Sequence, residues 1–207
     1  MGGGGLTFDL YAFLKAHWIE IAGSVLGLIQ IVLLARRSLW NFPLAMASVT
    51  LVGITLFEGR LYSEAGLQGF FFVVNALGWY QWSRVRSGDN AVPVGWMSTA
   101  ARLRWAAVTV LLSVTLGWIM HTFTNAALPF ADSAVTGASI AAQLLLNNRR
   151  IENWVLWVAI DLVSIALYLY RDLFFLAALY VAYLVISGIG LRQWTRVSRA
   201  EIQDGFA

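Results

Sequence analysis

The sequence predicts an all-α integral membrane protein with seven transmembrane helices. Of its 207 residues, 59% are hydrophobic and only 12% are charged. Soluble domains have about 25% charged residues, so a chain of this composition needs lipid to cover its apolar surface. The apolar residues also fall into runs of about 20 residues, which is the length that a helix needs to cross a bilayer.

Seven such runs follow one another along the chain. The fifth is the most polar, and short segments with arginine, glycine or proline connect them. The longest connection, about 86–103, contains Pro93 and is expected to be a hinge between two halves of the chain. The predicted spans are residues 18–35, 39–57, 67–85, 104–124, 132–148, 153–170 and 172–194.

The basic residues predict the orientation, because cytoplasmic loops carry an excess of arginine and lysine. Only Lys15, Arg60 and Arg171 fall on one side of the predicted membrane. The other side is therefore expected to be cytoplasmic, with the N-terminus outside and the C-terminus inside. The pI near 9.5 then reflects topology rather than nucleic-acid binding. The residues on the cytoplasmic side are Arg36, Arg37, Arg84, Arg86, Arg102, Arg104, Arg149, Arg150, Arg192, Arg196 and Arg199.

An internal repeat divides the chain into two parallel units. Because three spans are an odd number, a linker helix 4 is needed to restore direction, which gives a 3+1+3 parallel repeat. We expect an N-terminal extracytoplasmic segment (1–17), a first repeat (18–85), a loop with the linker helix (86–124), a second repeat (125–194) and a cytoplasmic tail (195–207). A shift of 112 residues aligns Arg37 with Arg149, Asn41 with Asn153, Phe42 with Trp154, Gly78 with Gly190, and Gln81-Trp82 with Gln193-Trp194.

Tryptophans near the span ends suggest an interfacial aromatic belt, since indoles favour the headgroup level. These are Trp18, Trp40, Trp82, Trp105 and Trp194.

Polar and aromatic residues form stripes at helical spacing inside four spans. Such stripes fit interhelical hydrogen bonding, but that role does not need tryptophans and tyrosines beside amides and a carboxylate. A small-molecule pocket does, because aromatic walls hold a ring and a few polar groups orient it. The candidate substrate-binding residues are Gln68, Asn75 and Trp79 in the third span, Gln143 in the fifth, Asn153, Trp157 and Asp161 in the sixth, and Tyr180 in the seventh.

Asp161 is the only acidic residue well inside a predicted span. Carboxylates within the membrane are usually functional. Asp161 is expected to bind a proton, to pair with a cationic substrate or to accept a hydrogen bond from a sugar hydroxyl. A structural hydrogen bond to a neighbouring tryptophan or tyrosine is the alternative.

The sequence lacks the residues that several classes of function need. The chain has no cysteine, two histidines and no P-loop motif, so we expect no metal, no cofactor and no ATPase activity. Its only lysine, Lys15, precedes the first span, which argues against a retinal Schiff base. An intramembrane enzyme would need convergent acid–base groups, and only one aspartate lies deep in a span. A non-transporting scaffold is a further alternative.

Two segments together resemble the PnuC family of vitamin transporters. The first is Leu77-Gly78-Trp79-Tyr80-Gln81-Trp82, and the second is Glu152-Asn153-Trp154-Val155-Leu156-Trp157 followed by Asp161. The resemblance covers about residues 18–196, although Trp40-Asn41-Phe42-Pro43 in the first half departs from its counterpart in the second.

The resemblance implies a seven-helix fold similar to the SWEET sugar transporters, but opposite in topology. It also implies a homotrimer in the bacterial inner membrane. Members of the family take up nicotinamide riboside by facilitated diffusion, and a cytoplasmic kinase then traps it by phosphorylation. The expected function is therefore uptake of nicotinamide riboside through the lipid bilayer by alternating access. Transport of another B vitamin, such as thiamine or riboflavin, remains an alternative. The resemblance places substrate contacts on Gln68, Asn75, Trp79, Asn153, Trp157, Asp161 and Tyr180.

Overall fold

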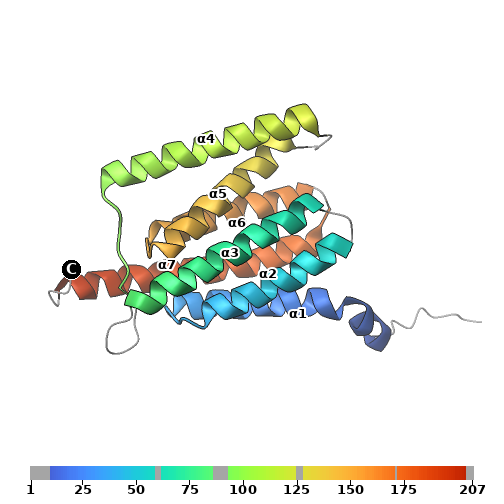
Figure 1. Cartoon of the computed structure of the whole chain (residues 1–207), viewed down its shortest axis with the longest axis horizontal. Helices are drawn as coiled ribbons and strands as arrows, with labels where there is room; N and C mark the ends of the chain where they lie inside the picture. Colours follow the sequence, from blue (N-terminus) through green and yellow to red (C-terminus); the bar gives the residue numbers. More distant parts are fainter. Residues whose placement is uncertain (1–9, 59–61, 86–92, 125–127, 171, 204–207) are drawn as a thin grey trace, which may run out of the picture.

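Seven helices account for nearly all of the residues that the structure, a computed structural model, describes: 10–58, 62–85, 93–124, 128–170 and 172–203. No strand occurs within these ranges, where the one β-type contact is a backbone bridge between Gly95 and Arg150. The helices are α1 (Leu10–Ala35), α2 (Asn41–Glu58), α3 (Tyr62–Val85), α4 (Thr99–Phe123), α5 (Pro129–Asn147), α6 (Glu152–Tyr170) and α7 (Phe174–Gln203) (Figure 1).

The helices agree with the seven predicted spans in number and order, and differ mainly at two ends. α1 begins eight residues before the predicted first span, and α7 continues nine residues beyond the predicted last one. Within the described residues, four segments are long and apolar enough to cross a membrane: α2, α4, α6 and residues 176–201 of α7. α1, α3 and α5 fall outside this group, although residues 21–35 of α1 form a shorter apolar segment.

Six of the helices close into a ring. α1 contacts α2, α2 contacts α3, α3 contacts α5, α5 contacts α6, α6 contacts α7, and α7 returns to α1. α4 contacts only α5 among the helices and lies at the edge of the bundle (Figure 1). Its outward side chains are large and apolar, including Leu103, Leu111 and Trp118, as expected for a helix surrounded by lipid.

The turns after α1 and α5 have the same geometry. Arg37 and Arg149 adopt the left-handed conformation, with φ of 57° and 59°. In both turns the backbone N–H of the following residue donates a hydrogen bond to the carbonyl five residues earlier. Ser38 donates to Leu33 and Arg150 donates to Leu145, both at 2.9 Å. This pattern satisfies helix C-terminal carbonyls and turns the chain sharply into the next helix.

Trp82 and Trp194 are fully buried, so their predicted place in an interfacial belt is wrong. The Trp82 indole donates to the carbonyl of Asn147 and the Trp194 indole donates to the carbonyl of Ala35, both at 3.1 Å. Because Ala35 and Asn147 are the last residues of α1 and α5, each indole caps a helix from the other three-helix group. Trp18 and Trp40 are largely exposed.

Two glycines let aromatic rings approach the helix backbone closely. A Cβ at Gly78 would lie 2.6 Å from the ring of Phe42, and a Cβ at Gly190 would lie 2.6 Å from the ring of Trp154. Phe42 contacts Trp82 edge to face at 5.2 Å between centroids, and Trp154 contacts Trp194 in the same way at 5.7 Å. These contacts belong to an apolar layer at the end of the bundle where α1, α3 and α5 finish.

Candidate functional site

A cavity of ≈ 210 Å³ lies inside the ring of six helices. All six ring helices contribute to its wall, whereas α4 does not. A cavity enclosed between the helices of a bundle is a common place for a small-molecule site. The lining residues are Gln30, Ile31, Leu34, Asn41, Ala45, Ser48, Val49, Phe71, Asn75, Ser139, Gln143, Leu146, Trp154, Trp157, Ile160, Asp161, Tyr180, Tyr183 and Ser187.

The wall formed by α6 and α7 carries a carboxylate. Asp161 is 3% exposed and accepts a hydrogen bond on Oδ2 from Ser187 Oγ at 3.0 Å. It forms no ion pair with any residue that the structure describes. A buried carboxylate that has one hydroxyl partner is costly unless a cation or further donors complete its environment. The site is therefore suited to a positively charged or hydroxyl-bearing guest.

Aromatic rings lie beside this carboxylate. Tyr180 contacts Tyr168 and Tyr183, with ring centroids 5.1 and 5.4 Å apart. Trp157, one helical turn before Asp161 on α6, also lines the cavity. Indole and phenol faces attract organic cations and accept flat rings. This wall thus combines a carboxyl group with aromatic surfaces.

An amide pair lies where α3 meets α5. The Gln143 Nε2 donates to Asn75 Oδ1 at 3.2 Å, and Asn75 Nδ2 donates to the carbonyl of Phe71 at 2.8 Å. Both side chains line the cavity and are buried. Amides offer donors and acceptors together, which is the chemistry that recognises sugar hydroxyls or a carboxamide.

The floor of the cavity is formed by the apolar layer that contains Trp154. Leu34 and Leu146 lie beside it, and all three are at most 3% exposed. The indole N–H of Trp154 is buried and has no hydrogen-bond acceptor among the described residues. The layer closes the cavity toward the end of the bundle that carries most of the arginines, which we call the arginine-rich end.

Five of the eight residues predicted for the substrate site line this cavity: Asn75, Gln143, Trp157, Asp161 and Tyr180. The structure does not place Gln68, Trp79 and Asn153 with them. Gln68 lies in a separate groove between α2 and α3, and Trp79 is 42% exposed on the outside of α3. Asn153 is fully buried in the first turn of α6, where its Nδ2 donates to the carbonyl of Arg150 at 2.6 Å.

Several cavity residues were not among the predicted site residues. Tyr183 and Ser187 follow Tyr180 at helical spacing, so the stripe on the seventh span contained the signal for them. Trp154 belongs to the motif that carries the family resemblance. Asn41, which aligns with Asn153, lines the cavity although its Nδ2 makes the corresponding 2.6 Å bond to the carbonyl of Ser38.

No group of three or more histidine, cysteine, aspartate or glutamate side chains that could hold a metal ion occurs in the part of the chain that the structure describes.

Comparisons with known proteins show which family the chain resembles. The family model described as "Nicotinamide mononucleotide transporter" matches residues 17–196. The chain is 30% identical to the nicotinamide riboside transporter PnuC of Escherichia coli K12, over 88% of this chain and 87% of that protein. It is equally identical, at 30%, to the riboflavin/roseoflavin transporter RibM of Streptomyces davaonensis, over 95% of this chain and 94% of that protein.

A solved structure has the same fold. It is described as a crystal structure of the vitamin B3 transporter PnuC, and it superimposes with a TM-score of 0.76 at 23% sequence identity. The match covers 92% of this chain and 86% of the other.

Proposed function

The chain belongs to the nicotinamide mononucleotide transporter family, and from this premise we propose that its central cavity carries nicotinamide riboside into the cell. It is a vitamin transporter and a multi-pass protein of the bacterial inner membrane. Nicotinamide riboside is a pyridinium cation attached to a ribose, so it presents a charged flat ring at one end and hydroxyls at the other.

The observation that carries the proposal is the environment of Asp161. Its carboxylate is buried beside aromatic rings and has a hydroxyl, but no cationic side chain, as its partner among the described residues. A pyridinium ring placed against Trp157 and Tyr180 supplies the missing positive charge. The amide pair of Asn75 and Gln143 then faces the ribose. We do not place Gln68, Trp79 and Asn153 in contact with the substrate. They lie in the α2–α3 groove, on the outer surface of α3 and in the first turn of α6.

The orientation and layout follow from the charge distribution and the repeat. We place the arginine-rich end in the cytoplasm, with the N-terminus outside. We describe the chain as two parallel three-helix units, α1–α3 and α5–α7, joined by α4 as the linker helix. Equivalent turns, indole caps and glycine contacts 112 residues apart support this layout.

Transport then occurs by alternating access between the two units as facilitated diffusion, and phosphorylation in the cytoplasm traps the substrate. We further propose that the chain assembles as a homotrimer, as the family resemblance implies. The mass of the detergent-solubilised protein, measured by light scattering with correction for bound detergent, tests the trimer.

Riboflavin is a second candidate substrate because the chain is as similar to RibM as to the E. coli transporter. Riboflavin is neutral and has three fused rings, so neither the Asp161 carboxylate nor a cavity of ≈ 210 Å³ favours it. Thiamine, a cation, fits the charge of the site.

A thermal-shift experiment on the purified protein separates these substrates. A ligand that binds only the folded state raises the melting temperature by mass action. We expect nicotinamide riboside to raise it more than thiamine or riboflavin at equal concentration. A larger shift with riboflavin would replace the proposed substrate, and no shift with any of the three would contradict a vitamin site in this cavity.

A further inference from the structure

The two three-helix units make polar contacts with each other at the arginine-rich end. There the Trp82 and Trp194 indoles cap the last carbonyls of α5 and α1, and the two indole rings lie 5.9 Å apart. Opening the cavity toward this end requires both indole bonds to break. The described structure is therefore closed at the arginine-rich end.

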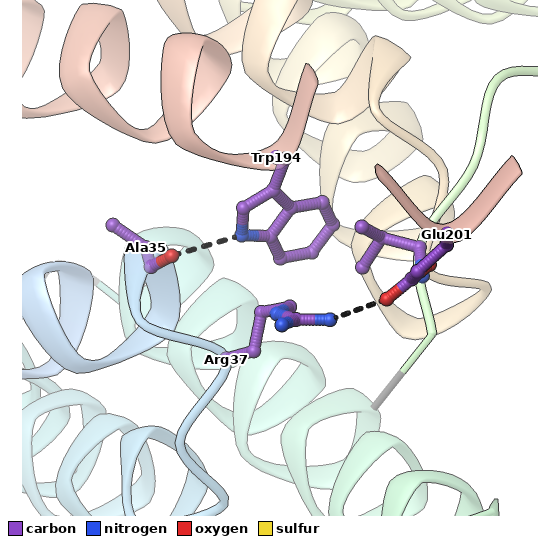
Figure 2. Close-up of polar contacts among 5 residues, drawn as sticks. Ala35, Arg37, Trp194 and Glu201 are labelled. Atoms are coloured by element: carbon purple, nitrogen blue, oxygen red, sulfur yellow. Dashed lines mark hydrogen bonds and ion pairs between the residues drawn. The ribbon is translucent and has the colours of Figure 1, made fainter. Parts of the chain in front are cut away.

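An ion pair spans the same junction nearer to the surface. Arg37 Nη1 lies 2.8 Å from Glu201 Oε1, and the two side chains are 14% and 28% exposed. Arg37 belongs to the turn after α1, whereas Glu201 lies on the extension of α7 beyond the predicted membrane span. Figure 2 shows this pair next to the bond between Trp194 and Ala35.

Glu201 also reaches the segment that leads into α4. The backbone N–H of Val94 donates to Glu201 Oε2 at 3.4 Å. We call residues 94–98 the strap. Its contact with Glu201 links three parts of the chain: the first unit through Arg37, the second unit through α7, and the strap.

The strap itself is bound to the second unit. Gly95 exchanges backbone hydrogen bonds with the turn before α6, donating to Arg149 at 3.2 Å and accepting from Ile151 at 3.1 Å. The Met97 N–H donates to Glu152 Oε1 at 2.9 Å, and Arg102 at the start of α4 pairs with the same oxygen at 2.7 Å. These bonds hold the strap and the first turn of α4 against α5–α7.

We propose that the Arg37–Glu201 ion pair is an electrostatic latch that stabilises the state closed at the arginine-rich end, and that the strap and α4 move as one body with α5–α7. Arg37 is the partner that leaves when the two units separate. This inference rests on the proposed alternating-access transport. A partly exposed ion pair has a modest effect, so the latch adjusts the balance between states and the buried indole contacts form the main closure.

A cysteine reporter tests the latch directly, because the chain contains no cysteine. Ala35 is 3% exposed and packs in the apolar layer, so Ala35→Cys reacts with a water-soluble maleimide only when the arginine-rich end opens. We expect Glu201→Gln and Arg37→Gln, each in this background, to increase the labelling rate about twofold to fivefold.

Arg102→Gln is the matched control. It removes an arginine from a second ion pair described at this end, but that pair joins α4 to α6 and does not connect the two units. Its labelling rate should equal that of the reporter alone. Equal rates for Glu201→Gln and Arg102→Gln would overturn the latch.

The charge-exchanged double variant, Arg37→Glu with Glu201→Arg, guards against a folding defect in either single variant. It should return the labelling rate toward that of the reporter alone, and a rate as high as in the single variants would contradict the proposal. The labelling needs no substrate. Failure of the latch is thus distinguishable from failure of the proposed function, which the vitamin thermal shifts report.

Discussion

At the scale of single residues, the chemistry of the cavity depends on Asp161, which accepts a hydrogen bond from Ser187 across the α6–α7 contact. Helical spacing placed Asp161 on the same face as Trp157, and the structure has both in the cavity wall. A single sequence does not show that Ser187 donates to Asp161, because the two lie on different helices. Contacts between helices depend on packing rather than on local spacing.

α3 shows where residue patterns mislead. Of the stripe that polarity selected there, Asn75 and Trp82 lie on the face turned inward, whereas Gln68 and Trp79 do not. The inward face also carries Phe71 and Gly78. The inward face is set by close packing, with Gly78 allowing the approach of Phe42, and polarity alone does not report that.

Replacing Asp161 with asparagine should weaken binding of the cation selectively. We expect Asp161→Asn to raise the Kd for nicotinamide riboside at least about tenfold, because a buried charge pair is lost. The reduced dihydronicotinamide riboside, which has nearly the same shape and no charge, is the matched ligand. Its Kd should change much less in isothermal titration calorimetry, and equal losses for both ligands would contradict a charge role for Asp161.

Trp157 is expected to supply a stacking surface. Trp157→Ala should raise the Kd for nicotinamide riboside about 30-fold, the size of a desolvated cation–π contact of about 2 kcal/mol, while the protein still folds. Trp157→Phe should retain part of the affinity. Calorimetry on monodisperse protein checks both, and unchanged affinity in folded Trp157→Ala would exclude this residue from the site.

At the scale of helices, hydropathy identified all seven elements but not their true ends. α7 continues past the apolar run to Gln203 because the residues after Trp194 include good helix formers such as Arg196, Arg199 and Glu201. Hydropathy marks where a helix leaves the membrane, whereas helix propensity and contacts determine where it ends. The left-handed conformation of Arg37 and Arg149 could not be predicted from the sequence either, since that conformation normally favours glycine or asparagine.

A substitution at Gly190 tests the close approach between α6 and α7. Gly190→Ala places a methyl group 2.6 Å from the Trp154 ring, and we expect a loss of about 1–3 kcal/mol in stability. Gly188→Ala is the matched control on the same helix, because a Cβ there meets nothing within 4 Å. Thermal unfolding in detergent should show a lower melting temperature only for Gly190→Ala.

At the scale of the whole molecule, the sequence repeat predicted equivalent positions, and equivalent contacts occur at those positions both within the units and between them. Gly78 with Phe42 and Gly190 with Trp154 are equivalent pairs, as are the two indole caps. The cavity wall does not follow the repeat. Trp157 and Asp161 align with Ala45 and Val49, so the charge and the indole come from the second unit alone.

The two indole caps should contribute similarly to the closure between units. Trp82→Phe and Trp194→Phe each keep the ring and remove one N–H, leaving the carbonyl of Asn147 or Ala35 without that donor. We expect each to destabilise the protein by about 1–3 kcal/mol, measured as the melting temperature without ligand. A large effect from only one of the two would show that the units do not close symmetrically.

The most direct test of the central claim is counterflow in sealed vesicles that contain the purified protein. The vesicles are preloaded with unlabelled nicotinamide riboside, ion gradients are collapsed, and entry of radiolabelled nicotinamide riboside is followed. A facilitative carrier predicts transient accumulation of the label above that in protein-free vesicles, and Asp161→Asn should reduce it. Entry no faster than in protein-free vesicles, or entry only with a proton gradient, would contradict the account.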